Sequence, residues 1–384
     1  MRRPLLFYAD WPLEYHNQEA AHKARAFAAA GYDTVYVTGA GIRNPRPASL
    51  RKAADRLRRK LTDEAQESGG RGDGVRTATL LVAPPRQLPP VRRANAAWAR
   101  RQLRAALGGP GGVAWIRIPS PELVDVLDDL APAAVVYECL DAYHHTPGMT
   151  GRWARRFDAA ERALVARADA VVVPGEHLAD RFRAWGAQPI VLPHGVDLSR
   201  FPLADPATPS PEPVLGFVGT LDFRIDVPLI RHLAERRPAW RVRLVGPVHD
   251  GFDPREIAGI ANITVEPAVP YAQVGALLAT FDVCLMPYAD IPVFHAMTPV
   301  KATEVMAVGK PAVVRRSRAL EPDGDLLYFA SGPDEFVEQV ERALAENGPE
   351  RAAARRRRAE QHELGARMDR YTAVPASLGA PPTA

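Results

Sequence analysis

Apolar, strand-like runs alternate with helical segments along nearly the whole sequence, and this alternation restricts the possible folds more than any other feature. The run TVYVT at residues 34–38 is β-branched and typical of a strand, and an alanine-rich segment before it ends at Gly31, as helices often do. Most of these strand runs are apolar throughout. Because such strands need cover on both faces, the pattern predicts parallel sheets flanked by helices, an α/β fold.

The same reading gives an expected set of elements for the rest of the chain. Expected strands lie at residues 5–10, 78–83, 113–118, 135–139, 170–173, 214–219, 242–245, 263–265, 283–287, 312–314 and 326–329. Expected helices lie at residues 18–30, 92–107, 120–130, 153–168, 227–236, 255–261, 271–280, 299–308 and 333–346, with a helical tail at 350–371.

The alternation is interrupted by a proline-rich stretch, PLADPATPSPEP at residues 202–213. A linker there divides the 384 residues into two domains, expected at 1–200 and 201–384, the second with a C-terminal helical tail. Each is expected to be a Rossmann-like, doubly wound domain. Since open parallel sheets bind ligands at the carboxyl ends of their strands, two such domains facing each other predict a site in the cleft between them.

Composition excludes several classes of protein. The formal net charge is only +4 and 47% of residues are hydrophobic, which argues against a disordered chain and against a nucleic-acid partner. No apolar run reaches the roughly 18 residues of a membrane span. The only cysteines, Cys139 and Cys284, are expected to be buried reduced thiols of a cytoplasmic protein. The run Arg355–Arg358 is expected on a solvated helix, where it allows at most a weak contact with an anionic membrane surface.

The segment TPVKATEVMAVGKP at residues 298–311 contains the strongest candidates for binding chemistry. Lys301 and Glu304 are three residues apart and share one face of the expected helix. A lysine in the first turn adds positive charge where the helix dipole is already positive, which is unfavourable unless an anion binds there. Glu304 could accept hydrogen bonds from ribose hydroxyls. The alternative is an ordinary surface Lys–Glu pair.

Two further turns carry polar residues. In GFVGTLDFRID, Gly219 ends a strand where a backbone could approach a phosphate closely, and Arg224 follows to neutralise it. In LPHGVDLSRF, His194 lies in a turn and is more readily explained as a structural residue than as a catalytic one.

Taken together, these strings resemble glycosyltransferases of the GT-B fold, particularly family 4, also called group 1. PHGVDLSRF is similar to a signature of that family, and PVKATEVMAVGKPAVV is similar to its donor-site helix. VLGFVGTLDFRID, RVRLVGP, YECLDAY and ERALVARADAVVVPGEHLADRF also resemble family segments, so that the likeness covers roughly residues 134–345.

The resemblance implies transfer of a sugar from a nucleoside-diphosphate sugar, typically with retention at the anomeric carbon. It assigns the diphosphate to Arg224 and Lys301, the ribose to Glu304, and a close phosphate approach to the turn at Gly219. The loop backbone at residues 294–298 would also face the donor. No metal and no cofactor are expected, because two cations and helix amides can stabilise the leaving diphosphate. Both cations should then be free of carboxylate partners.

One position departs from the family pattern. Many members carry a glutamate eight residues before the second glutamate, in contact with the donor sugar. Here that position is Ala296, with His295 beside it. The resemblance therefore leaves the sugar and the stereochemical outcome open, and His295 is a candidate polar substitute or a histidine without a role.

Acceptor contacts are expected after the early strands of the first domain. Asp10, Trp11 and His16 follow the first strand. Asp141 and His144, with His145 beside them, follow the strand YECL and could act as an acid–base pair on an acceptor hydroxyl, or could cap a turn and lie exposed.

Two other functions fit the same residues. One is a sugar-nucleotide 2-epimerase, which the missing carboxylate at position 296 disfavours. The other is a non-catalytic partner subunit that binds a sugar nucleotide, which Arg224, Lys301 and Glu304 disfavour because a pure interaction protein needs no diphosphate site. The acceptor is left open among a sugar chain, a lipid and a secondary metabolite.

Overall fold

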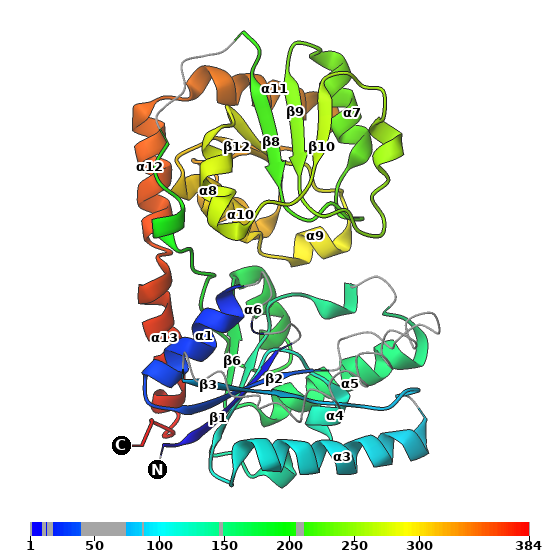
Figure 1. Cartoon of the computed structure of the whole chain (residues 1–384), viewed down its shortest axis with the longest axis vertical. Helices are drawn as coiled ribbons and strands as arrows, with labels where there is room; N and C mark the ends of the chain where they lie inside the picture. The colour runs from blue at the N-terminus through cyan, green and yellow to red at the C-terminus, as the bar shows by residue number, and fades with distance from the viewer. Residues whose placement is uncertain are drawn as a thin grey trace. The chain divides into compact units, whose positions relative to one another are not determined.

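The chain forms two compact units in the computed structural model, which describes residues 2–9, 13, 18–39, 74–86, 88–145, 149–204 and 211–383. The first unit comprises Met1–Leu192 together with Met368–Ala384, and the second comprises Pro193–Arg367 (Figure 1). Among the described residues, no helix is both long and apolar enough to cross a membrane.

The first unit is built on a seven-stranded parallel sheet in the order β3-β2-β1-β4-β5-β6-β7. Strands β1, β4, β5 and β6 are buried along almost their whole length, as their apolar sequences require. The strands are β1 Pro4–Ala9, β2 Asp33–Thr38, β3 Val75–Thr79, β4 Val113–Ile116, β5 Ala134–Glu138, β6 Ala170–Val173 and β7 Ile190–Val191.

Helices connect these strands, as parallel pairing demands. The helices of the first unit are α1 Gln18–Ala29, α3 Pro89–Leu107, α4 Pro121–Val124, α5 Gly151–Arg167 and α6 Glu176–Arg183, with 3₁₀ turns at Asp128–Leu130 and Tyr143–His145. The helix expected over residues 120–130 is therefore shorter, because only four residues are α-helical before the 3₁₀ turn.

The second unit is built on a six-stranded parallel sheet in the order β10-β9-β8-β11-β12-β13. Its strands are β8 Val214–Val218, β9 Arg241–Val245, β10 Ile263–Glu266, β11 Val283–Met286, β12 Ala312–Arg315 and β13 Tyr328–Ala330. Its helices are α7 Val227–Arg236, α8 Tyr271–Ala279, α9 Pro292–Ala296, α10 Val300–Ala307, α11 Pro333–Glu346 and α12 Pro349–Glu360, followed by α13 Leu364–Ser377, which leads into the first unit. The expected helix at 255–261 is only a 3₁₀ turn, Pro254–Ile257.

Both sheets have the strand order of a Rossmann-like, doubly wound fold. In each, the third, second and first strands of the unit are followed across the sheet by the fourth, fifth and sixth. This confirms the predicted α/β class. The order reverses between β1 and β4 in the first unit and between β8 and β11 in the second, and ligands of such sheets bind at this switch point.

The compact units differ from the expected domain ranges at the C-terminal end. Residues Met368–Ala384 belong to the first unit, and the units meet in sequence at Leu192 and Pro193 rather than at residue 200. The reason is the burial of Tyr371, whose hydroxyl donates to the Leu192 carbonyl at 2.9 Å and whose ring lies 3.8 Å from the Lys23 ammonium.

The arginine run on α12 is not the solvated face expected from the sequence. Arg355 is completely buried and donates to the Gly309 carbonyl at 3.1 Å. Arg356 donates to the Ala307 carbonyl at 2.8 Å, and Arg358 pairs with Asp323 at 2.5 Å. Only Arg357 of the four is exposed. These side chains serve the packing of α12 against α10, which composition alone does not show.

Candidate functional site

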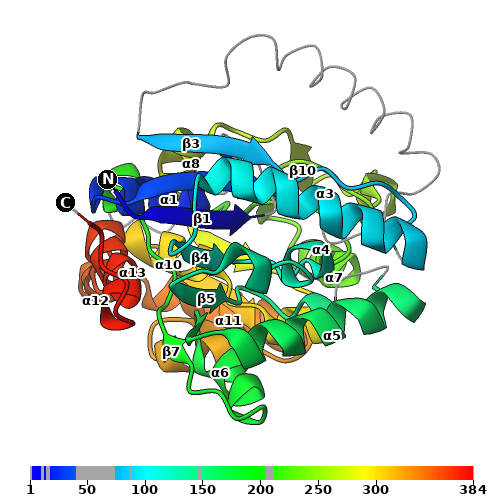
Figure 2. The same cartoon turned by 90° about the horizontal axis from the view of Figure 1, so that it is seen from below.

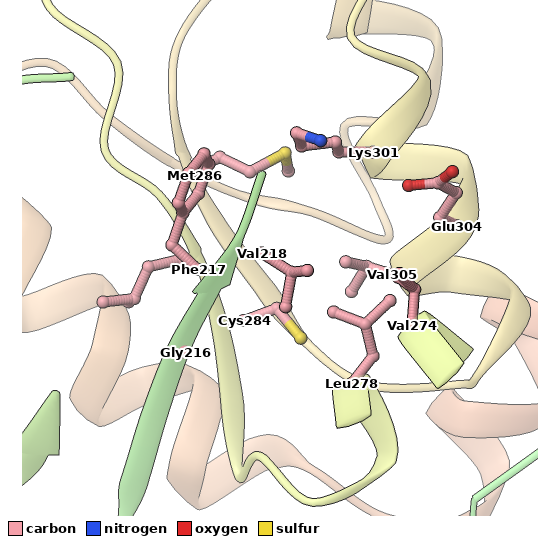
Figure 3. A pocket seen from close by; sticks show the side chains of 11 residues that line it. Gly216, Phe217, Val218, Val274, Leu278, Cys284, Met286, Lys301, Glu304 and Val305 are labelled. Atoms are coloured by element: carbon pink, nitrogen blue, oxygen red, sulfur yellow. The ribbon is translucent and has the colours of Figure 1, made fainter. Parts of the chain in front are cut away.

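A small pocket lies at the switch point of the second sheet. Its walls come from β8, β11, α8 and α10, and Figure 3 shows Lys301 and Glu304 on the α10 side with Phe217 and Met286 on the strand side. The floor is apolar, with Val218, Cys284 and Val305 among its residues. The pocket therefore combines one cation, one carboxylate and an apolar floor, in the place where this sheet topology predicts a ligand.

Gly219 and Lys301 lie against each other just beyond the carboxyl end of β8. A β-carbon at Gly219 would stand 2.4 Å from Lys301 Cε and 2.6 Å from its Nζ. The glycine also has φ +154°, a conformation that residues with side chains rarely adopt. The absence of a side chain at position 219 is therefore what leaves room for the lysine, and the two residues that the sequence singled out separately form one feature.

Lys301 carries a positive charge that the described part of the chain does not neutralise. It is half-buried in the first turn of α10, and no described carboxylate lies within ion-pair distance of its ammonium. Burial lowers the pKa of Lys301, and the nearby Arg224 lowers it further, while Glu304 opposes the shift. A bound anion would relieve this cost, and Lys301 lies in the first turn of α10, where a helix favours anions.

Arg224 is paired with a carboxylate, contrary to the expectation from the sequence. Its Nε lies 2.9 Å from Asp222 Oδ1 and its Nη2 lies 2.7 Å from Asp222 Oδ2. Asp222 also accepts from the Arg224 backbone amide at 3.0 Å, so the pair closes a tight turn after β8. Arg224 still acts electrostatically on Lys301, but the ion pair occupies two of its donors.

Glu304 is buried one turn after Lys301 and accepts a hydrogen bond from the Tyr271 hydroxyl at 2.9 Å. Burial raises the pKa of Tyr271, and the Glu304 charge raises it further. Sequence reasoning missed Tyr271, because the contact joins residues 33 positions apart and nothing in the expected helix 271–280 singles out its first residue. The tyrosine fixes one oxygen of the carboxylate.

The residues before α10 differ from the expected loop. Residues Pro292–Ala296 form the short helix α9, so His295 and Ala296 lie on a helical turn rather than in the loop expected at 294–298. His295 is exposed, and its Nε2 lies 2.7 Å from Asp290 Oδ1. This hydrogen bond lowers the pKa of Asp290. The predicted role of His295 toward the donor has no support in this geometry, because the ring is engaged by Asp290.

Of the two roles considered for Asp141 and His144, an acid–base pair or a turn cap beside an exposed histidine, the geometry matches the second. The Asp141 carboxylate accepts from the Ala142 backbone amide at 2.9 Å and so caps its own turn. His144 is exposed, as the structural alternative expects, and its ring lies tilted against that of His145 with 4.0 Å between the ring centroids. Burial lowers the pKa of His144 to about 4, helped by the positive charge of Arg181 and by His145, and opposed by Asp158. Asp141 is not among the groups that act on it. The other acceptor candidates, Asp10, Trp11 and His16, lie outside the described residues.

Near His144 the first unit contains a buried ion pair that sequence reasoning did not find. Glu161 is buried and accepts from the Tyr137 hydroxyl at 2.8 Å and from Arg181 Nη1 at 3.1 Å. The helix expected at 153–168 places Glu161 on its apolar side, next to Ala160 and Leu164. That position could have indicated from the sequence that Glu161 is buried. An acidic residue inside an apolar stripe requires a buried partner.

Two protein-family models match the chain. The model described as "Glycosyl transferase 4-like domain" matches residues 16–195, and the model described as "Glycosyl transferase-like" matches residues 224–373. The second range contains Arg224, Lys301 and Glu304.

One curated relative is a Bacillus subtilis protein named as a teichuronic acid biosynthesis glycosyltransferase, TuaH. It is 26% identical over an alignment of 239 positions that covers 56% of this chain and 60% of the relative. The chain thus spans about three fifths of that relative's length.

Solved structures of similar fold cover nearly the entire chain. A sucrose-phosphate synthase from Thermosynechococcus elongatus has a TM-score of 0.74 at 17% identity, covering 98% of this chain and 99% of that one. The Anabaena protein HepE, in complex with UDP and glucose, has a TM-score of 0.63 at 14% identity, covering 98% and 100%. At such identities the likeness concerns the fold.

Proposed function

Because the chain is a GT-B-fold glycosyltransferase similar to those of group 1 and family 4, we propose that it transfers a sugar from a nucleoside-diphosphate sugar to an acceptor hydroxyl. The observation that carries the proposal is Lys301, a cation without an ion-pair partner among the described residues, held against Gly219 at the switch point of the second sheet. HepE, a protein of similar fold, is named as a complex with UDP-glucose.

In this proposal Lys301 and the first amides of α10 hold the diphosphate. As the bond to the sugar breaks, negative charge develops on the leaving phosphate oxygen, and a preorganised cation in a site with an apolar floor stabilises it. Arg224 adds less to the positive potential, because Asp222 balances its charge. Lys301 and the helix amides therefore supply most of this stabilisation, for which the proposal needs no metal, and the resemblance favours retention of configuration.

Glu304 binds the ribose in this arrangement. Tyr271 holds one of its oxygens, which fixes the carboxylate plane before the nucleotide arrives. On the acceptor side, His144 with a pKa of about 4 is neutral at pH 7 and can hydrogen-bond a hydroxyl.

A second candidate is a non-catalytic subunit that binds a sugar nucleotide. The pairing of Arg224 with Asp222 and the alanine at position 296 favour it, because both reduce the groups that are available to the transition state. The two candidates differ in turnover. A transferase releases nucleoside diphosphate from its sugar nucleotide, whereas a binding subunit retains the nucleotide unchanged.

The test begins with a thermal-shift panel of UDP, GDP and TDP and their sugars, followed by calorimetry with the best binder. We expect Lys301→Met to weaken that binding by about 1.5–3 kcal/mol, the usual scale for a hydrogen bond to a charged group. The matched control is Lys310→Met, a buried lysine of the same unit that does not line the pocket and should leave the affinity unchanged. Equal affinities in wild type and Lys301→Met would remove the donor site.

A further inference from the structure

Helix α3 of the first unit is the most one-sided charged element of the described chain. Its 19 residues contain five arginines and no aspartate or glutamate. It is the long helix labelled at the foot of Figure 1, and Figure 2 shows its full length. The proposed sugar transfer uses none of these residues, so their charge calls for its own explanation.

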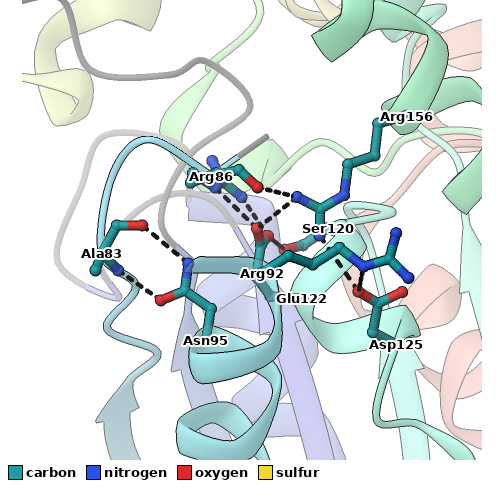
Figure 4. Close-up of polar contacts among 8 residues, drawn as sticks. All are labelled: Ala83, Arg86, Arg92, Asn95, Ser120, Glu122, Asp125 and Arg156. Atoms are coloured by element: carbon teal, nitrogen blue, oxygen red, sulfur yellow. Dashed lines mark hydrogen bonds and ion pairs between the residues drawn. The ribbon is translucent and has the colours of Figure 1, made fainter. Parts of the chain in front are cut away.

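The inner side of α3 is fixed to the unit. Asn95, Ala99, Leu103 and Leu107 are buried, and the Asn95 side chain bonds both backbone groups of Ala83, at 2.8 and 2.9 Å (Figure 4). Because these anchors recur every four residues, they hold one stripe of the helix inward and turn the opposite stripe outward.

Only part of the arginine charge is neutralised within the unit. Arg92 pairs with Asp125 at 3.4 Å and Arg100 pairs with Asp129 at 2.6 Å. Arg104 donates to the Asp129 carbonyl at 2.8 Å, which leaves its charge in place. Arg93 and Arg101 are exposed, and among the described residues neither has an ion-pair partner.

The outward stripe also carries an indole. Trp98 is 40% exposed and lies three residues before Arg101, and its neighbours on this side are the small exposed residues Ala94 and Ala97. We call Arg93, Ala94, Ala97, Trp98, Arg101 and Arg104 the α3 outer face. It joins three positive charges to one large amphipathic ring, with nothing bulky between them.

We propose that the α3 outer face docks the protein on a bilayer surface that contains anionic phospholipids. Arg93 and Arg101 are eight residues apart, so they are spaced about 12 Å along a straight helix and can reach separate headgroups of a flat surface. Guanidinium groups match phosphate oxygens bidentately. An indole suits the headgroup level, where one edge stays wet and the other meets acyl chains.

Of the two arginine-rich helices, only α3 presents its charge outward to an anionic surface. The arginine run of α12, where the sequence placed a weak membrane contact, is directed into its own unit by Arg355, Arg356 and Arg358. The α3 outer face is therefore the better-supported basic surface of the two, and it carries the apolar side chain that α12 lacks.

The test is flotation or cosedimentation of the full chain with vesicles of neutral phosphatidylcholine, and with vesicles in which 30% is replaced by phosphatidylglycerol. We expect binding to the anionic vesicles only, weakening as salt rises because exposed charges are screened. Arg93→Gln/Arg101→Gln should weaken the partition coefficient about 30-fold. The matched control, Arg236→Gln/Arg357→Gln, removes the same charge from exposed arginines of the second unit and should bind as wild type.

A second measurement addresses Trp98. Anionic vesicles should shift the tryptophan emission of the wild type to shorter wavelength, and Trp98→Phe should abolish the shift. Equal binding to both kinds of vesicle, or equal losses in the two double variants, would overturn the proposal. Binding to single-stranded DNA but not to vesicles would assign the face to another polyanion and overturn it too. No sugar nucleotide is present, so the outcome is independent of the donor site.

Discussion

At the scale of single residues, the two cations predicted for the diphosphate have different surroundings. Lys301 has a lowered pKa because burial and Arg224 both oppose its charge, and it is the residue that an anion would stabilise. Arg224 already has a carboxylate two residues earlier, in the sequence LDFRID. Spacing alone does not decide whether such a carboxylate folds back on the arginine, since that depends on the turn between them.

His362 gives a pH-dependent prediction at the same scale. Burial lowers its pKa to about 4, and the positive charges of Arg367 and Arg358 contribute in the same direction. Between pH 4 and about 6.5 the unfolded chain binds a proton that the folded chain does not. Stability should therefore fall as the pH falls through this window, by up to about 3 kcal/mol.

His362→Gln should reduce this acid destabilisation, measured by urea unfolding at pH 7 and pH 5. The control is His249→Gln, an exposed histidine of the same unit, which should retain the wild-type slope. Equal slopes in wild type and His362→Gln would show that the buried imidazole does not carry the effect.

At the scale of elements, α12 supplies hydrogen-bond donors to the carboxyl-terminal end of α10. The last carbonyls of an α-helix lack partners within the helix, and α10 has no basic residue in its own last turn. Arg356 supplies a donor to Ala307, and its Nη1 also reaches the Phe201 carbonyl at 2.5 Å. Arg355 adds the bond to Gly309. We infer that this fixes α10 along its axis, and with it Lys301 in the first turn and Glu304 in the middle of the helix.

Arg356→Met should therefore weaken nucleoside-diphosphate binding about three- to tenfold at a temperature well below unfolding, because about 1 kcal/mol of carbonyl bonding is lost at the far end of the helix. Arg356→Lys should restore part of it. The neighbouring exposed Arg357→Met is the control. A lower melting temperature with unchanged affinity would reduce Arg356 to a purely structural role.

At the scale of the whole molecule, the chain returns at its C-terminal end to the unit in which it began. Tyr371 is buried there, with its ring 6.0 Å from Trp115 and beside Lys23. Lys23 is itself completely buried and pairs with Glu138, so the returning segment covers a charged interior. Removing the ring would open that interior to water.

Tyr371→Ala should cost the first unit about 3–5 kcal/mol, the range for deleting a large buried ring. Hydrogen exchange should report the loss in β4 and β5, whereas the nucleotide affinity of the second unit should be unchanged under folding conditions. Tyr371→Phe keeps the ring and should cost only about 1 kcal/mol, for the bond to Leu192. Exposed Arg370→Ala is the control. Unchanged exchange in Tyr371→Ala would contradict this role.

The sequence by itself determined features that depend on near neighbours. The alternation of apolar strands and helices is enough to predict the two parallel sheets, and a spacing of three residues is enough to place Lys301 and Glu304 on one face of α10. Gly219 could be singled out because a glycine at a strand end marks a close approach.

Only the tertiary structure decided the features that join distant residues. These are the partner of Glu304, Tyr271, which lies 33 positions away, the burial of the α12 residue Arg355 against Gly309, and the return of residues 368–384 to the first unit. The physical reason is that the local sequence does not indicate whether a charged or aromatic side chain faces solvent or a buried partner. That depends on how distant elements pack, whereas hydrophobic periodicity reports only neighbouring residues.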